Sequence, residues 1–173
     1  RQYMRTIAII PARMGSSRFP GKPLAPLHGR TMLEHVYMRT RLCNELHNVV
    51  VATCDSEISA AVSAFGGSCI MTSSTHERAS DRIAEAAESL DADIFVLVQG
   101  DEPMTHPDMI SEAITPMINN SEIIVTNLMG DIKSDDEFED RNCIKVVLDK
   151  NGNAMYFSRE PIPTQRGSKS VPM

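Results

Sequence analysis

The feature that most constrains this fold is a series of short apolar runs separated by longer segments with helical periodicity. The runs most typical of strands are Thr6–Pro11, Asn48–Thr53 and Asp93–Val98. A short apolar run without polar alternation is typical of a strand that is buried on both faces of a parallel sheet. The sequence predicts further strands at Cys69–Thr72, Glu122–Leu128 and Cys143–Leu148.

The segments between these runs are predicted to be helices. The predicted helices are residues 32–41, Asp55–Phe65, Ser80–Leu90 and Pro107–Met117. Thr31 can cap the first helix, and Gly66 and Gly67 suit the left-handed end of the second. The residues of the third helix predicted to face inward are Ile83, Ala84, Ala87 and Leu90. Strands that alternate with helices predict an α/β fold, with an open, mostly parallel sheet and helices on both faces. No linker divides the sequence, so residues 1–173 are predicted to form a single domain.

Composition narrows the range of functions. The net charge of -6 argues against a general affinity for nucleic acid or a membrane surface, because both need a broad positive field. No apolar run approaches the roughly 18 residues of a membrane span, and the N-terminus lacks the apolar core of a signal peptide, so a cytoplasmic location is predicted. The cysteines lack CxxC spacing and are predicted to be reduced, mostly buried thiols rather than a disulfide frame or zinc site. They are Cys43, Cys54, Cys69 and Cys143.

The segment from Ile9 to Leu24, IIPARMGSSRFPGKPL, joins the first predicted strand to a loop rich in basic residues, glycine and serine. The residues of interest are Arg13, Arg18 and Lys22, with Gly15, Ser16, Ser17 and Gly21. Cationic side chains and hydroxyl groups bind phosphate oxygens, and glycine lets the backbone approach a ligand closely. We therefore predict a phosphate-binding loop, and the alternative is a solvated basic loop after a buried strand.

A second candidate site follows the strand at 93–98, where the sequence QGDEP runs from Gln99 to Pro103. In open α/β sheets, ligands bind at the carboxyl ends of the strands, where both stretches are predicted to lie. A basic loop facing an acidic strand end is expected for a metal-nucleotide site. Asp101 could hold Mg2+, which takes few protein oxygens, and its alternative role is a turn or helix-capping residue. Glu102 is predicted to orient the turn or to support the ligand.

The start of the third predicted helix has two interpretations. Asp81 could simply favour the helix dipole, or it could contact a nucleoside. The chain contains neither GxxxxGK[ST] nor GxGxxG, which argues against the usual ATPase and dinucleotide-binding sites. A nucleotide site in this chain would therefore use a different phosphate-binding sequence.

Five sequence blocks carry a family resemblance: PARMGSSRFPGKPL, VATCD, ERASDRIAEA, VQGDEPM and MYFSREPIP, spread over Ile7–Pro163. They resemble the sugar-acid cytidylyltransferases, and VQGDEPM favours the 3-deoxy-manno-octulosonate (CMP-KDO synthetase) branch over acylneuraminate and spore-coat polysaccharide relatives. The resemblance implies a nucleotide-diphospho-sugar-transferase-like fold. It implies a reaction of CTP with a 2-keto sugar acid, dependent on Mg2+, that yields CMP-sugar and diphosphate for lipopolysaccharide or other surface-polysaccharide synthesis. It also implies a homodimer.

The resemblance implies roles for individual residues. The implied nucleotide-binding residues are Pro11, Ala12, Arg13, Gly15, Ser16, Ser17, Arg18, Lys22, Ser80 and Asp81. Arg13, Lys22 and Asp101 would be catalytic, the two cations stabilising phosphate charge and Asp101 ligating Mg2+. The implied sugar-binding residues are Gln99, Tyr156, Ser158 and Arg159. Arg159 is a natural partner for the sugar carboxylate, whereas without the resemblance a surface salt bridge is the simpler interpretation.

This chain also departs from the family. Where the family reads SGTDR, residues 78–82 read RASDR, so Arg78 replaces a small residue beside the expected nucleoside. The family continues into a sugar-binding, dimer-forming stretch and a later metal-binding carboxylate. Because this chain opens on Arg1 and stops at Met173 in a Pro-rich and Ser-rich stretch, we expect further sequence beyond it. Three alternatives stay open: a nucleotide-binding protein without turnover, a cytidylyltransferase for another, acylneuraminate-like sugar acid, and a nucleotidyltransferase using another base or a non-sugar acceptor.

Overall fold

The computed structural model describes residues 4–15 and 20–164, and the chain divides into two compact units, Arg1–Thr126 and Asn127–Met173. A single domain stays a prediction, because a compact unit need not be one that folds by itself. Within the described residues, no helix combines the length and the apolar character needed to cross a membrane.

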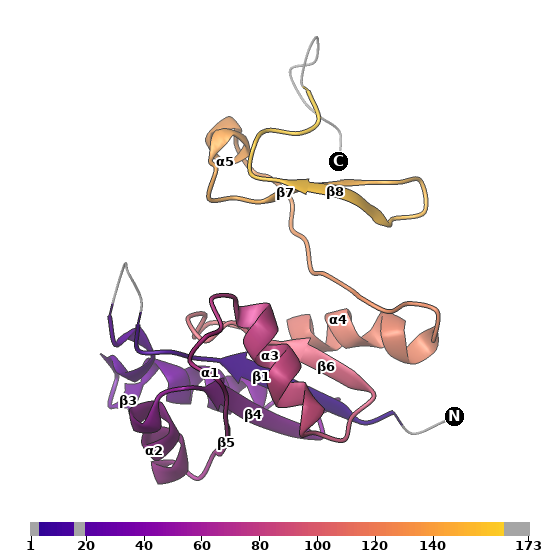
Figure 1. The fold of residues 1–173 in the computed structure, drawn as a ribbon. Helices are drawn as coiled ribbons and strands as arrows, with labels where there is room; N and C mark the ends of the chain where they lie inside the picture. The colour runs from indigo at the N-terminus through magenta and orange to yellow at the C-terminus, as the bar shows by residue number, and fades with distance from the viewer. Residues whose placement is uncertain (1–3, 16–19, 165–173) are drawn as a thin grey trace. The chain divides into compact units, whose positions relative to one another are not determined.

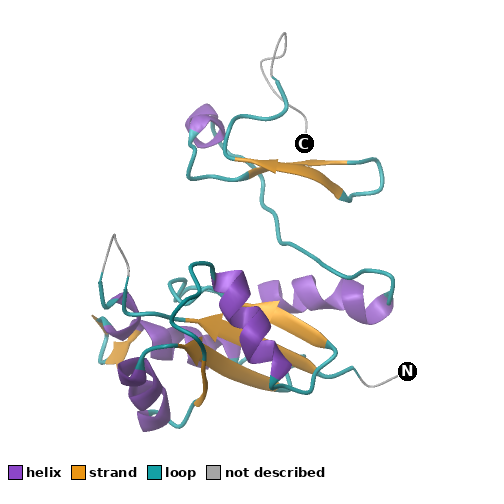
Figure 2. Ribbon diagram, viewed as in Figure 1, coloured by secondary structure: helices purple, strands orange, loops and turns teal. Residues whose placement is uncertain are grey.

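The larger unit is built on a four-stranded parallel sheet (Figures 1 and 2). Its strands are β1 (Thr6–Pro11), β4 (Asn48–Thr53), β5 (Ser68–Met71) and β6 (Ile94–Leu97), in the spatial order β5-β4-β1-β6. Ile9 of the central strand β1 aligns with Val50 of β4 on one side and with Leu97 of β6 on the other. β1 and β4 are buried along almost their whole length, so the predicted parallel strands with two covered faces are confirmed.

Four helices cover the two faces of this sheet. They are α1 (Met32–Thr40), α2 (Ser56–Ala64), α3 (Ala79–Glu88) and α4 (Pro107–Asn119). On one face, Leu33 of α1, Ile58 of α2 and Ile110 of α4 join one apolar cluster. α3 covers the other face (Figure 1), where its Ala86 joins a second apolar cluster. The predicted α/β architecture is therefore confirmed, and burial of apolar surface on both faces holds it together.

The strand order creates a switch point between β1 and β6. From β1 the chain moves outward through α1 and α2 to β4 and β5, and then returns through α3 to the far side of β1. Because crossovers between parallel strands are right-handed, this reversal of direction puts α3 on the opposite face of the sheet. The carboxyl ends of β1 and β6 lie at the position where open α/β sheets bind ligands.

Several predicted element ends are present. Thr31 Oγ1 accepts the N–H of Glu34 at 3.1 Å and so caps α1. Gly66 follows α2 with a φ of 77°, which is the predicted left-handed end of that helix. The turn at Gly29, with a φ of 80°, joins a short antiparallel pair that was not predicted. The elements of this region are η1, a 3-10 helix (Lys22–Leu24), β2 (Pro26–Leu27) and β3 (Arg30–Thr31).

The inward face of α3 differs from the prediction at one position. The apolar residues at this face are Ile83, Ala86, Ala87 and Leu90. Ala84 was predicted to face inward and is exposed, so that assignment is wrong. Alanine is small and apolar enough to suit either side of a helix, and spacing alone does not fix which alanine meets the sheet.

The strand predicted at Glu122–Leu128 is also wrong, because these residues form no strand in the structure. Ile124 and Val125 are 85% and 75% exposed. The segment follows closely on α4, which continues to Asn119, and no described strand pairs with it. β-branched residues favour a strand only where a neighbouring strand and a core provide contacts.

The smaller unit contains a helix and an antiparallel hairpin. Its elements are α5 (Asp135–Glu139), β7 (Lys145–Leu148) and β8 (Ala154–Ser158). The strand predicted at Cys143–Leu148 is confirmed over its last four residues, but it pairs with β8 instead of joining the parallel sheet. At the hairpin turn, the Asp149 carboxylate accepts the N–H groups of Asn151 at 2.8 Å and Asn153 at 2.9 Å. β8 itself was not predicted.

A buried lysine ties the smaller unit together. Lys145 is only 2% exposed, and its ammonium group donates to three backbone carbonyls. These are the carbonyls of Asp140 at 2.7 Å, Cys143 at 2.7 Å and Arg159 at 2.8 Å. The three bonds use all the donors of the ammonium group and join the segment after α5 to the end of β8.

We expect Lys145→Met to lower the free energy of unfolding of the smaller unit by at least about 2 kcal/mol, because three backbone carbonyls would lose the donor that the buried lysine provides. Hydrogen exchange of the β7 and β8 amides as a function of urea would measure this change. Lys150→Met, in the exposed turn of the same hairpin, is the matched control. Equal exchange in the two variants would contradict the prediction.

Candidate active site

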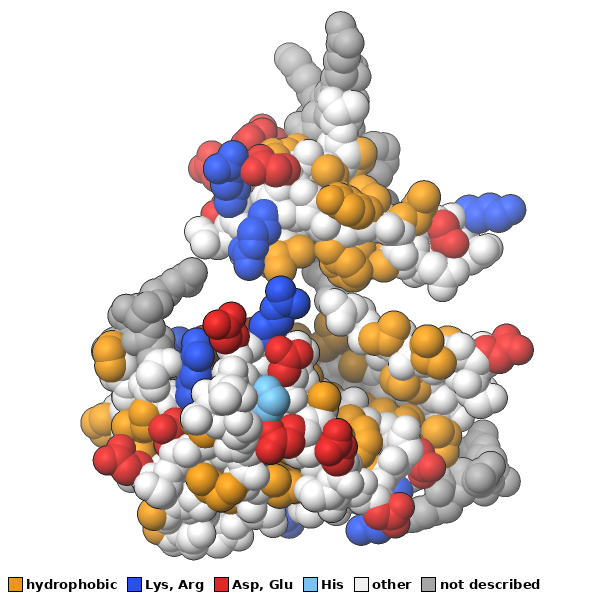
Figure 3. Space-filling model, in the orientation of Figure 1, with side chains coloured by type: hydrophobic (Ala, Val, Ile, Leu, Met, Phe, Trp, Pro, Cys, Tyr) orange, Lys and Arg blue, Asp and Glu red, His pale blue; other side chains and the backbone are white. Residues whose placement is uncertain are grey.

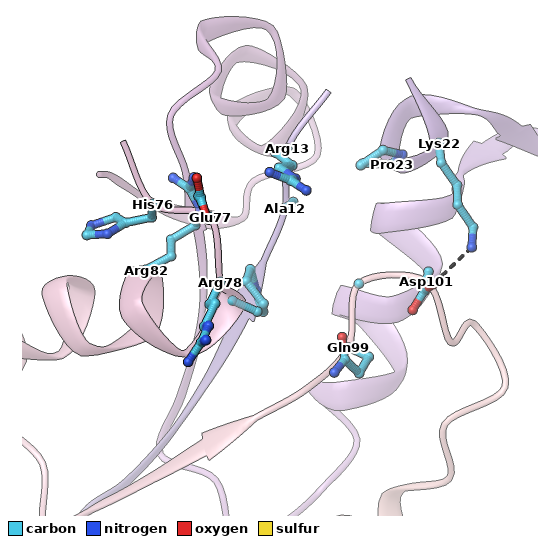
Figure 4. Close-up of a pocket in the computed structure, with 13 residues that line it drawn as sticks. Ala12, Arg13, Lys22, Pro23, His76, Glu77, Arg78, Arg82, Gln99 and Asp101 are labelled. Carbon is cyan, nitrogen blue, oxygen red and sulfur yellow. Dashed lines mark hydrogen bonds and ion pairs between the residues drawn. The ribbon is translucent and has the colours of Figure 1, made fainter. Parts of the chain in front are cut away.

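A pocket of about 340 Å3 opens at the carboxyl ends of β1 and β6. In Figure 4, Lys22 and Asp101 lie on one side, His76 and Arg78 on the other, and Arg13 between them. The pocket is lined by Pro11, Ala12, Arg13, Lys22, Pro23, His76, Glu77, Arg78, Ala79, Arg82, Gln99, Gly100 and Asp101. The basic loop and the acidic strand end therefore meet at the switch point of the sheet, as the sequence predicts.

Two cations flank the narrow base of the basic loop. Arg13 lies two residues after the end of β1, and Lys22 begins η1. The N–H of Gly21 donates to the carbonyl of Met14 at 3.0 Å, which brings the two arms of the loop together. We call the residues Arg13, Met14, Gly21 and Lys22 the loop neck. The neck places two fixed positive charges on one pocket, which is a suitable arrangement for a polyphosphate.

Asp101 lies across from this neck. Lys22 Nζ is 2.9 Å from Asp101 Oδ2, and the two side chains are 37% and 55% exposed. An ion pair this exposed contributes little to the stability of the fold. Its importance is for binding a ligand in the pocket. The other oxygen, Oδ1, has no hydrogen-bond partner within the described residues. Asp101 lies in a turn, whereas the helix-capping role belongs to His106 at the start of α4.

The predicted site residues lie in four places. Those that line the pocket are Pro11, Ala12, Arg13, Lys22, Gln99 and Asp101. Those of the larger unit outside the lining are Gly15, Ser80 and Asp81, all exposed. Those of the smaller unit are Tyr156, Ser158 and Arg159. Ser16, Ser17 and Arg18 lie outside the described residues. The structure thus brings the catalytic candidates together, while the individual roles stay predictions.

Sequence reasoning did not assign a site role to Arg82, which is 3% exposed and lines the pocket. Its guanidinium donates to Thr72 Oγ1 and to the carbonyl of Ser73, the latter at 3.1 Å. A buried cation persists only with such partners. In the sequence, Arg82 lies four residues before Ala86, on the helix face that meets the sheet, and this spacing could have indicated that its side chain points inward.

The wall of the pocket beside α3 is held by Glu85. Both of its carboxylate oxygens accept the N–H of Ser73, at 3.1 and 3.0 Å, and Oε2 also contacts Nε2 of His76. The Ser73 N–H and then His76 lower the pKa of Glu85. Charged and histidine side chains gather on this face of the larger unit, near α3 (Figure 3). Glu85 therefore fixes the segment that carries His76 into the pocket.

We expect this contact to be lost in acid. A carboxyl group with a lowered pKa in the folded state stabilises the fold above its unfolded pKa of about 4.3, and that stabilisation disappears as the pH falls through the folded pKa. The difference in Tm between wild type and Glu85→Gln should therefore shrink between pH 7 and about pH 3. Glu88→Gln, exposed on the same helix, controls for the loss of charge. A difference that stays constant with pH would contradict this assignment.

The sugar-binding candidates of the smaller unit have mixed environments. Tyr156 is 63% exposed on β8, and Ser158 Oγ accepts the N–H of Glu160 at 3.0 Å. Arg159 donates through Nη1 to the carbonyl of Arg141 at 2.9 Å. Within the described residues Arg159 makes no salt bridge, and its neighbour Glu160 pairs with Arg141, so the role of Arg159 stays a prediction.

The described residues contain no cluster of three or more His, Cys, Asp or Glu side chains arranged to hold a metal ion. All four cysteines are free, with Cys43 buried and the other three only partly so, where mostly buried thiols were predicted. Burial raises the pKa of the Cys43 and Cys69 thiols, which makes them poor nucleophiles and metal ligands. A metal at the pocket would take few ligands from this part of the chain, which suits Mg2+ better than zinc.

Comparison with known proteins identifies relatives over nearly the whole chain. A cytidylyltransferase family profile matches residues 7–171. The 3-deoxy-manno-octulosonate cytidylyltransferase of Geobacter metallireducens is 50% identical over 163 residues, covering 94% of this chain and 64% of the relative. That of Thermodesulfovibrio yellowstonii is 47% identical over 171 residues, covering 94% and 67%. The chain therefore spans about two thirds of the length of these relatives.

Solved structures agree with the sequence relatives. A structure of CMP:2-keto-3-deoxy-manno-octonic acid synthetase complexed with CTP matches with a TM-score of 0.87 and 36% identity, covering 96% of this chain and 69% of that one. A structure of 4-diphosphocytidyl-2C-methyl-D-erythritol synthase, at 16% identity and a TM-score of 0.53, shares the fold and covers 75% of this chain and 64% of that one. The predicted resemblance and fold class are confirmed.

Proposed function

Because this chain belongs to the cytidylyltransferase family, we propose that it joins CTP to a 2-keto sugar acid, 3-deoxy-manno-octulosonate, and releases diphosphate. The observation that carries this proposal is the meeting of Arg13, Lys22 and Asp101 in one pocket at the switch point of the sheet. The relatives named for this reaction and the structural relative that holds CTP support the same nucleotide and acceptor.

The proposed reaction is an in-line displacement at phosphorus. The anomeric hydroxyl of the sugar acid attacks the α-phosphorus of CTP, a P–O bond forms, the bond to the departing diphosphate breaks, and the hydroxyl proton is released to solvent. Arg13 and Lys22 stabilise the negative charge on the phosphates as it moves to the leaving group. The end of β1 at Pro11 and Ala12 provides backbone beside the cytosine. The reaction needs little covalent chemistry from the protein. Positioning of the substrates and stabilisation of charge supply most of the rate enhancement.

The pocket suits Mg2+ through its carboxylate. Asp101 is exposed at a strand end, and its Oδ1 is free of hydrogen-bond partners within the described residues. Mg2+ is commonly held by one or two carboxylates together with substrate phosphates, and when bound it neutralises part of the phosphate charge. We propose that Asp101 holds it, and that Lys22 turns from Asp101 to the phosphates when the nucleotide enters.

Residues of both units are proposed to bind the acceptor. Gln99 lines the pocket at the end of β6 and can donate to a sugar hydroxyl. By family resemblance, Tyr156, Ser158 and Arg159 of the smaller unit are also proposed to bind the sugar acid, with the Arg159 guanidinium binding the carboxylate. By family resemblance we also propose a cytoplasmic homodimer that serves lipopolysaccharide or other surface-polysaccharide synthesis.

Diphosphate release from CTP and Mg2+ with a panel of 2-keto sugar acids tests this function. We expect release with 3-deoxy-manno-octulosonate, and weaker release when CTP is replaced by other nucleoside triphosphates. No release with any sugar acid, by the full-length protein, would refute the proposal. Calorimetric binding of CTP without sugar-dependent release would instead identify a nucleotide-binding protein without turnover.

A further inference from the structure

We propose that Asp55 is a positioning residue, which holds the loop neck so that Arg13 and Lys22 meet the phosphates in a fixed geometry. This inference rests on the proposed function. Asp55 directly precedes α2 and follows β4. It does not line the pocket, so it would act on the nucleotide only through the neck.

The first observation is the direction of the Asp55 side chain. An Asp before a helix normally caps it by accepting an N–H of the first turn. Asp55 makes no such bond to α2. Its Oδ2 instead accepts the N–H of Met14 at 2.7 Å, across 41 positions of sequence. The Asp55 carboxylate therefore bonds to the basic loop, and it does not cap the start of α2.

The second observation is that Met14 is bonded on both sides. Its N–H donates to Asp55, and its carbonyl accepts the N–H of Gly21 at 3.0 Å. Arg13 is the residue before Met14, and Lys22 is the residue after Gly21. The carboxylate therefore holds one arm of the neck directly and the other arm through Met14, and with them the backbone positions of both cations.

Asp55 is itself held in place. Its N–H donates to Oγ1 of Thr53 at 3.1 Å, and Thr53 is fully buried. The end of β1 is bonded to the same strand, because the N–H of Ala12 donates to the carbonyl of Ala52 at 3.0 Å. The chain from β4 to the neck is therefore a short series of hydrogen bonds based on a buried strand end.

Charge alone does not explain an aspartate here. A carboxylate near a polyphosphate repels it, so Asp55 would weaken nucleotide binding if it acted through its charge. Its benefit must come from the hydrogen bond, which an Asn side chain can also accept. This reasoning separates two variants: Asp55→Asn keeps an acceptor and loses the charge, and Asp55→Ala loses both.

The experiment compares these variants with Glu57→Ala, which removes an acidic side chain from the first turn of the same helix. We expect Asp55→Ala to lower kcat about 10-fold or more through misplaced cations and to weaken CTP binding measured by calorimetry. Asp55→Asn and Glu57→Ala should remain within about 3-fold of wild type. Hydrogen exchange at the Met14 and Gly21 amides should increase in Asp55→Ala alone.

Each outcome has a separate meaning. Faster exchange at Met14 and Gly21 with unchanged kcat and CTP affinity would overturn the positioning role and leave the proposed function intact. Equal losses in Asp55→Asn and Asp55→Ala would also overturn it, because the charge would then be the active element. A wild-type protein that binds CTP without sugar-dependent release would refute the proposed reaction, and CTP affinity across the variants would still decide the role of Asp55.

Discussion

Replacement of Asp101 by Asn should lower turnover of CTP and sugar acid at least ~100-fold, as expected for the loss of one group that stabilises charge in the transition state. Asn keeps the size of the side chain and an oxygen acceptor but loses the negative charge that Mg2+ prefers. The loss should be partly recovered by high Mg2+, because a weakened metal site fills at higher concentration.

Asp91→Asn is the matched control for this variant. Asp91 is 96% exposed and pairs with Arg5, which precedes β1 at the opposite end of the sheet from the pocket. Steady-state diphosphate release over a range of Mg2+ concentrations would give the comparison. Turnover by Asp101→Asn at the wild-type rate would show that the metal site has been misplaced.

Replacement of Lys22 by Ala should also lower turnover at least ~100-fold, but with the opposite dependence on Mg2+. The ammonium group would be missing when charge develops on the departing diphosphate. At the same time, Asp101 would lose the cation that lies 2.9 Å from its Oδ2. A carboxylate without that competitor should bind Mg2+ more tightly, so half-saturation should fall below the wild-type concentration.

Lys133→Ala serves as the control for the loss of a lysine, since Lys133 is exposed in the smaller unit. Lys22→Arg adds a second test, because a guanidinium keeps the charge with a different geometry. It should recover part of the lost rate. A Lys22→Ala variant with normal turnover, or one that needs more Mg2+ than wild type, would contradict the proposed sharing of Asp101.

The strands and helices that depend on local pattern could be predicted from the sequence. Thr6–Pro11 and Asn48–Thr53 are continuous apolar runs, and burial on both faces follows directly from that composition. The strand predicted at Glu122–Leu128 failed because β-branched side chains need a neighbouring strand, which sequence does not provide. The antiparallel pairing of β7 depends on β8, a short apolar run that is mostly exposed in the structure and that was not predicted to be a strand.

The candidate site divides in the same way. Arg13, Lys22 and Asp101 could be predicted because the loops that carry them follow β1 and β6, and the carboxyl ends of parallel strands meet. Arg82 and Glu85 could not, because their importance comes from hydrogen bonds to a loop about ten residues away. Such bonds depend on where the folded backbone places each carbonyl and N–H, and spacing gives no signal for them.

The closed neck has a consequence for protein engineering. Residues 15–20 are inserted between Met14 and Gly21, which are bonded to each other. A library that randomises this insertion, with the four neck residues and Asp55 kept constant, would vary the groups offered to a nucleotide while leaving the attachment of the loop unchanged. Selection from such a library for turnover of CTP would explore phosphate binding separately from base preference, because the cytosine is proposed to lie beside Pro11 and Ala12, outside the insertion.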